Sequence, residues 1–361
     1  MTAIGFTLAT GGASLAQAQE VSNAANCTTA DHCYGLVQWS HGNAAGAQLQ
    51  LGVYKLNPIT PASNFITAEF WIGFDPPANR PNDALWLEYG AIHGIWCNNN
   101  LSWFSALQRS VVPEDFTLTC HGAAAESNDK HLLHAEKSTS SSWNLYRNGP
   151  WVMGYANTPT GTYGFDVGQE TTSNSAQGSM TGGRLRFKYE STGEWANGWA
   201  STNYPAGGDN PNGTPCYSMW VSKPNDMRAR CNIAPTINTT PQAYPPQPIL
   251  SPVEEAQRIA GILGVPTASL RSFEVVETTN KIAHQQIESN VEGDQAVEVI
   301  QMEGDFSGTV LPTPPHAKKP NGKVATLIFD KATGAMLSLR LTENRRVNLN
   351  NLGTVKQLQR G

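Results

Sequence analysis

The fold class of this chain is decided by residues 65–94, FITAEFWIGFDPPANRPNDALWLEYGAIHG. Two apolar runs flank a loop rich in proline and asparagine, which is the pattern of a β-hairpin with a long loop. Strict alternation in the second run separates Trp86 and Glu88 from the apolar side chains of the other face, Leu85, Leu87 and Tyr89. A carboxyl group beside a tryptophan in mid-strand lies either on a solvated outer face or in a wet concave site.

The stretches on both sides of this hairpin repeat the same pattern. At least eight short strands separated by turns, with no helical period before residue 245, predict an all-β antiparallel sandwich. The pair Asn148-Gly149 between two alternating runs indicates a hairpin with a type I′ turn. In RLRFKYES, residues 184–191, basic and apolar side chains alternate, which predicts one solvated face and one core face.

Composition divides the 361 residues into two parts. All six cysteines and all ten tryptophans precede Ala234, and residues 1–244 carry 12 Lys+Arg against 17 Asp+Glu. No basic stripe occurs, which argues against nucleic acid as a partner. The chain as a whole is predicted to be mainly β, with a sandwich over residues 21–232, a Pro/Thr-rich linker over residues 233–250, and a small α+β domain over residues 251–361.

The first twenty residues, MTAIGFTLATGGASLAQAQE, are typical of a secretory signal peptide. They contain a short apolar run and an A-x-A cleavage site at Ala16 to Ala18, and the alternative is a disordered tail rich in Ala and Gly. No other apolar run approaches the roughly 18 residues of a membrane span. We therefore expect a secreted, extracellular monomer that does not associate with membranes.

Six cysteines in an exported chain predict disulfides rather than a metal site. Proximity alone favours three local pairs: Cys27–Cys33, Cys97–Cys120 and Cys216–Cys231.

The C-terminal part predicts one helix packed on an antiparallel sheet. Ser251 as N-cap, Pro252 in the first position and Glu254 two residues later form a capping-box pattern. The helix carries one apolar face and ends at Gly264. Four strand-like stretches follow it, and the last two form a hairpin whose turn lies between Asp330 and Gly334.

Glu88 and Glu170 are the candidate catalytic residues. Each lies in mid-strand with a glycine two residues away, and a glycine within a strand marks a bulge or a close backbone approach. Two carboxyl groups within about 5 Å need not ionise alike, so one can act as acid and the other as base. With a water between them they would hydrolyse peptide or glycosidic bonds. The competing interpretation is that both face solvent on an outer sheet surface.

Two other functions remain open. Tryptophans on a concave sheet face can stack on sugar rings, although core packing competes for every one of them; the set in question is Trp86, Trp96, Trp103, Trp143 and Trp151. A structural secreted protein without a small ligand is the third possibility. In HLLH the two histidines, His131 and His134, point to opposite faces of a strand, and no HExxH motif occurs. We therefore expect no metal and no cofactor.

The order of these features resembles the glutamic-peptidase sandwiches, the neprosin-like and fungal-type acid peptidases with a concanavalin-like fold. The matching pieces are WIGFD at 71–75, EYG at 88–90 and GQE at 168–170. The resemblance implies a concanavalin-like sandwich in which Glu88 and Glu170 are the acid–base pair, active at acidic pH on a polypeptide; a polysaccharide substrate remains open. We expect Trp86 to line the cleft, with Trp71 and Gln169 as further substrate-binding residues. The tryptophan that usually follows the first E-x-G is absent here.

Residues 251–361 resemble the PepSY-type modules of secreted bacterial proteins. The resemblance lies in the helix, the EGDFSG turn at 303–308 and the FDKATG hairpin at 329–334. In that group such modules are often attached to peptidases and are thought to restrain them.

Overall fold

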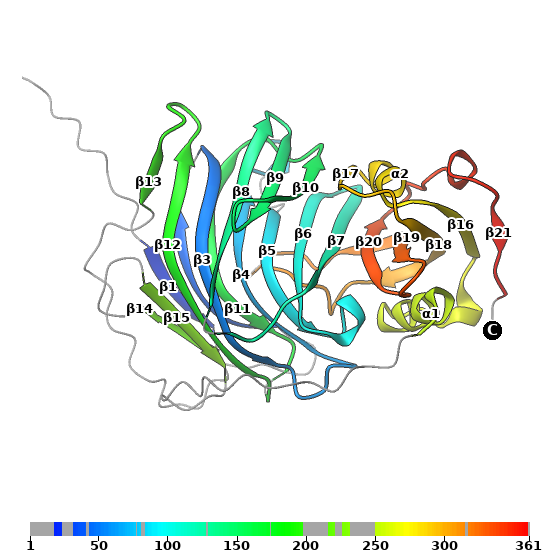
Figure 1. The fold of residues 1–361 in the computed structure, drawn as a ribbon, viewed down its shortest axis with the longest axis horizontal. Coiled ribbons are helices and arrows are strands. Elements are labelled where there is room, and N and C mark those ends of the chain that lie inside the picture. Colours follow the sequence, from blue (N-terminus) through cyan, green and yellow to red (C-terminus); the bar gives the residue numbers. More distant parts are fainter. Residues whose placement is uncertain are drawn as a thin grey trace, which may run out of the picture.

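Two antiparallel β-sheets stack as a sandwich, and a small α+β unit follows them in the chain (Figure 1). The fold is therefore mainly β, as the sequence predicts. The computed structural model describes residues 18–23, 32–40, 43–76, 78–80, 84–127, 129–173, 175–197, 216–220, 226–231, 250–314 and 317–359. Residues 1–17 of the predicted signal peptide and nearly all of the predicted linker lie outside these ranges, so the domain boundaries stay predictions.

The first sheet has twelve strands among the described residues. They are β1 (Ala18–Asn23), β2 (Cys33–Ser40), β4 (Phe65–Phe74), β5 (Leu85–Gly94), β6 (Ser102–Val111), β7 (Glu114–Ala123), β11 (Thr162–Thr171), β16 (Ser272–Thr279), β18 (Ala296–Ser307), β19 (Asn321–Asp330), β20 (Met336–Thr342) and β21 (Lys356–Gln357). Their order across the sheet is β1-β2-β11-β4-β5-β6-β7-β20-β19-β18-β16-β21.

The second sheet lies against the first. Its strands are β3 (Ala44–Asn57), β8 (Lys130–Thr139), β9 (Ser142–Arg147), β10 (Trp151–Ala156), β12 (Gln177–Tyr189), β13 (Trp195–Asn197), β14 (Cys216–Trp220), β15 (Asp226–Cys231) and β17 (Ser289–Asn290). The order is β14-β15-β12-β3-β8-β9-β10-β17, with β13 beside β12. The helical segments are α1 (Pro252–Ile262), α2 (Asn280–Gln286), η1 (Cys97–Asn99), η2 (Thr267–Ser269) and η3 (Leu349–Asn351).

The hairpin over residues 65–94 forms as predicted, because β4 and β5 pair residue for residue along their whole length. Every residue of both strands is buried. One face packs Phe70 and Tyr89 into the core between the two sheets. The other face packs Trp71 and Trp86 into a second core, which includes residues of α1 and of the C-terminal strands. The interpretation in which Glu88 faces solvent is therefore wrong.

The C-terminal strands extend the sandwich sheet instead of forming a separate one. Strand β20 pairs with β7, with Leu339 opposite Leu118. A buried ion pair crosses the same junction, where Arg340 donates to both oxygens of Asp115 at 3.0 and 2.7 Å. In Figure 1 the C-terminal elements, from yellow to red, continue the sandwich at one end. The sandwich and the C-terminal unit therefore share both a sheet and a core.

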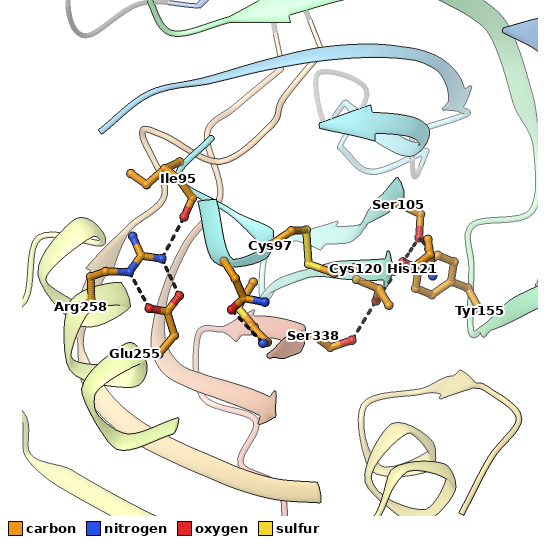
Figure 2. Close-up of a disulfide and its surroundings, with 12 residues drawn as sticks. Ile95, Cys97, Ser105, Cys120, His121, Tyr155, Glu255, Arg258 and Ser338 are labelled. Atoms are coloured by element: carbon orange, nitrogen blue, oxygen red, sulfur yellow. Dashed lines mark hydrogen bonds and ion pairs between the residues drawn. A yellow bond between two sulfur atoms is a disulfide. The ribbon is translucent and has the colours of Figure 1, made fainter. Parts of the chain in front are cut away.

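Helix α1 has the predicted capping box, in which Ser251 and Glu254 bond reciprocally. Its buried face contacts the outer face of the first sheet, and Arg258 is held between the Glu255 carboxylate and the carbonyl oxygen of Ile95 (Figure 2). The sequence interpretation missed α2, a helix of only seven residues that directly follows a strand.

The disulfide Cys97–Cys120 is confirmed and joins η1 to β7 (Figure 2). Cys33 and Cys231 are also disulfide-bonded. These two pairings stay predictions, because the side chains of the predicted partners lie outside the described residues: Cys27 and Cys216. None of the helices in the described ranges is long and apolar enough to cross a membrane.

Candidate acid–base site

Three glutamates lie on one face of the first sheet, on three neighbouring strands. Glu170 is on β11, Glu69 on β4 and Glu88 on β5. The register places Glu69 opposite Gly168 on one side and Gly90 on the other. Each glutamate is thus offset by two residues from the next, and positions two apart share a face. The three side chains form a diagonal row, and none of them has exposed surface. Burial of Glu170 contradicts the solvent-facing interpretation for this residue as well.

The two glycines that marked Glu88 and Glu170 in the sequence both flank Glu69. A Cβ on Gly90 would lie 2.3 Å from the carbonyl oxygen of Ala68 and 2.4 Å from the Cβ of Glu69. Only a glycine fits there, so the E-x-G pattern makes room for a third carboxyl. The sequence interpretation missed Glu69, although its alternation with Trp71 places it on the same face.

The surroundings of Glu88 and Glu69 favour the protonated form of both carboxyl groups. Burial raises the pKa of Glu88 well above its usual 4.5, and the charge of Glu170 raises it further. The nearby indole N–H groups of Trp71 and Trp86 oppose this rise, although neither reaches hydrogen-bond geometry. Burial also raises the pKa of Glu69, with additional contributions from the charges of Glu88 and Glu170. None of the four oxygens of Glu69 and Glu88 has a hydrogen-bond partner among the described residues.

Glu170 has a different environment. Its two oxygens each accept from the backbone N–H of Thr313 at 3.1 Å, and one of them also contacts Nδ1 of His32. The other ring nitrogen of His32 lies 2.8 Å from the carbonyl oxygen of Thr309. Glu170 is therefore the member of the row whose oxygens have hydrogen-bond partners.

The residues predicted to bind substrate divide between the two faces of the sheet. Trp71 lies directly opposite Glu88 in the strand register, and Trp86 is two residues from Glu88 on the same face. Gln169 lies on the opposite face of β11, and its amide nitrogen is 2.6 Å from the place of a Cβ on Gly178 in the second sheet. The structure therefore brings both tryptophans to the carboxyl row and does not bring Gln169 there.

A segment of the C-terminal unit covers the row. We call residues 309–313, in the connection between β18 and β19, the covering segment; in Figure 1 this orange connection reaches back toward the sandwich strands. The hydroxyl of Tyr34 donates to the carbonyl oxygen of Thr313, and the indole of Trp96 donates to that of Val310 at 2.7 Å. Leu311 and Thr313 are fully buried. The carboxyl row is thus closed on its outer side by the chain's own backbone.

Other candidate sites lack a suitable arrangement. A cavity of about 620 Å³ lies beside the Cys97–Cys120 disulfide, and none of the three glutamates of the row lines it. Ser105 lies 2.7 Å from both His121 and the hydroxyl of Tyr155 (Figure 2), but Ser105 is fully buried, and burial lowers the pKa of His121 to about 3. No group of three or more metal-ligating side chains occurs within the described ranges.

The tryptophans required by the sugar-binding alternative lie in the cores. Four of the five are buried, and only Trp151 is partly exposed; the buried ones are Trp86, Trp96, Trp103 and Trp143.

No family model matches the chain, and no curated protein sequence matches it. Among solved structures it is similar to Scytalido-glutamic peptidase, with 10% identity and a TM-score of 0.33 over 54% of this chain and 96% of the other. SCP-B, a member of the eqolisin family of peptidases, has the same identity and score over 56% and 98%. An endo-β-1,4-glucuronan lyase from the fungus Trichoderma reesei follows with 12% identity and a TM-score of 0.27 over 43% and 75%. At these levels of similarity, function must be argued from the site itself.

Proposed function

We propose that this chain is an exported hydrolase of the glutamic-peptidase type, with Glu170 as general base and Glu88 as general acid. One observation carries the proposal: two buried carboxyl groups with raised pKa values lie in one row with a third that accepts from a backbone N–H. Acid–base hydrolysis needs two neighbouring carboxyl groups whose surroundings give them different pKa values, so that one is protonated while the other is ionised.

In the proposed reaction, Glu170 takes one proton from a water, and the oxygen of that water adds to the carbonyl carbon of the scissile bond. The protonated Glu88 gives its proton to the departing nitrogen. The C–N bond then breaks, which leaves a carboxylic acid and an amine. Burial also raises the pKa of Glu69, which favours its neutral form and limits repulsion within the row.

The surrounding residues support this assignment. Trp71 and Trp86 exclude water from one side of Glu88, and their N–H groups face a carboxyl whose charge develops as its proton leaves. Because the reaction requires Glu88 protonated, activity should be greatest at acidic pH and fall as the pH rises. Export of the chain is part of the proposal, and disulfide bonding fits an oxidising compartment.

The test is cleavage of casein at acidic pH by the full chain carrying Thr313→Pro, which takes the Thr313 N–H off Glu170, followed by mass spectrometry of the products. Removing a general acid typically costs about 10²- to 10⁴-fold in rate, so Glu88→Gln should lose cleavage by that factor. The matched control is Glu114→Gln, because Glu114 is another buried carboxyl with a raised pKa but lies at the start of β7 beside Lys318. Equal rates for Glu88→Gln and the control would overturn the assignment.

A further inference from the structure

We infer that the covering segment occupies the substrate site as an internal peptide ligand, and that His32, Tyr34 and Trp96 recognise the backbone of a polypeptide. This inference rests on the proposed function for the chemistry of the site, but it concerns what binds there. It names the substrate class as polypeptide and makes the C-terminal unit a built-in competitor of substrate.

The contacts between the site and the covering segment are made to main-chain atoms. A ring nitrogen of His32 is within hydrogen-bond distance of the Thr309 carbonyl oxygen. The indole N–H of Trp96 donates to the carbonyl oxygen of Val310. The hydroxyl of Tyr34 donates to the carbonyl oxygen of Thr313. The Thr313 N–H meets Glu170. Its side-chain hydroxyl instead bonds within the segment, to the carbonyl oxygen of Leu311 at 2.8 Å.

Donors that meet backbone carbonyls, with an acceptor that meets a backbone N–H, form a site for peptide groups. Burial and the charge of Glu170 raise the pKa of Tyr34 well above 10, so its hydroxyl keeps its proton and remains a donor. Each sugar hydroxyl both donates and accepts, and would not require this fixed division into donors and an acceptor. The arrangement therefore favours a polypeptide over a polysaccharide.

The sequence of the covering segment suits an occupant that resists cleavage. In the run VLPTPPH, residues 310–316, the prolines at 312, 314 and 315 leave three of the six peptide bonds without a backbone N–H. The amide of Thr313 is thus the one N–H between Leu311 and His316, and it is held on Glu170. With the covering segment in place Glu170 has no exposed surface, so the proposed base is closed off from solvent water.

Comparing Thr313→Pro with Thr313→Ala distinguishes the contribution of the Thr313 N–H from that of the Thr313 side chain. Proline removes the donor to Glu170, whereas alanine keeps it and loses only the hydroxyl bond inside the segment. A hydrogen bond to a charged group is worth about 10- to 100-fold in an equilibrium. We expect Thr313→Pro to bind a fluorescein-labelled peptide with the sequence of residues 308–316 about 10- to 100-fold more tightly than the wild type and Thr313→Ala do, as measured by fluorescence anisotropy.

A second variant releases the covering segment without a new proline, so the test still holds if Thr313→Pro disturbs folding. Leu311→Ala removes a fully buried anchor of the covering segment, while the added peptide keeps its leucine. This variant should also bind the peptide at least about tenfold more tightly than the wild type does, since truncating a buried leucine costs more than one factor of ten.

Equal peptide affinity in the wild type and in both releasing variants would overturn the inference. So would displacement of the labelled peptide by an oligosaccharide at a lower concentration than by unlabelled peptide. Tight peptide binding without acid cleavage of casein would leave the inference standing and refute the proposed hydrolysis.

Discussion

Replacing Glu88 by glutamine should change how the stability of the protein depends on pH. Burial and the charge of Glu170 raise the pKa of Glu88 above 4.5, so above pH 4.5 the folded chain keeps a proton at Glu88 that the unfolded chain has lost. The contribution of the protonated Glu88 to the free energy of unfolding is fully present below pH 4.5. It is lost as the pH rises through the raised pKa of the folded state. Glutamine stays neutral in both states and removes this dependence.

The size of the effect follows from a difference of one proton between the two states. Linkage gives a slope of about 1.4 kcal/mol per pH unit for each such proton. His121 and His284 contribute slopes of opposite sign, because burial lowers their pKa values to about 3 and about 4. Only the difference between variant and wild type isolates Glu88. The variant should therefore become more stable relative to the wild type by about 1.4 kcal/mol per pH unit above pH 4.5.

Urea unfolding at several pH values between 4.5 and neutrality measures this difference. Glu114→Gln is the control, because burial raises the pKa of Glu114 to about 7; its difference from the wild type should show the same slope and stop growing near pH 7. A difference between Glu88→Gln and the wild type that stays constant across this range would refute the reasoning, because Glu88 would then titrate alike in the folded and unfolded chains.

Three further predictions concern the framework of the site. Gly90→Ala should lower the unfolding free energy by about 1–3 kcal/mol in urea, because the new Cβ would meet the backbone of β4; no loss would show that β4 can yield. Arg340→Met should cost about 1–3 kcal/mol in the same assay, because it leaves the half-buried Asp115 carboxylate without its bidentate partner. Changing both Cys97 and Cys120 to serine should cost about 2–4 kcal/mol, and dithiothreitol should then have less effect on the variant than on the wild type.

Features with a local signature could be read from the sequence. The turn at Asn148 and Gly149 forms with positive φ at both residues, 55° and 103°, as a type I′ turn requires. The capping box of α1 and the alternation of β5 are equally local. Glu69 had such a signature too, because alternation places it on the face of Trp71, but no motif drew attention to it.

The closure of the site could not be read from the sequence. Glu170 and Thr313 are 143 residues apart in the chain, and the strand pairing that brings them together joins β7 to β20. Pairing between strands that lie more than 200 residues apart in the chain, as Thr119 and Ser338 do, leaves no local pattern in either strand. The predicted place of Gln169 in the site was wrong for a simpler reason. Gln169 is next to Glu170 in sequence, and a strand places neighbouring side chains on opposite faces.

The most direct test of the account is acid cleavage of casein by the full chain carrying Thr313→Pro, compared with Thr313→Pro combined with Glu88→Gln and with Glu114→Gln. The account predicts cleavage by the single variant and by the combination with Glu114→Gln, and a loss of at least about 100-fold in the combination with Glu88→Gln. Cleavage at the same rate in all three chains, or in none of them, would contradict the claim that the glutamate row is an acid–base site.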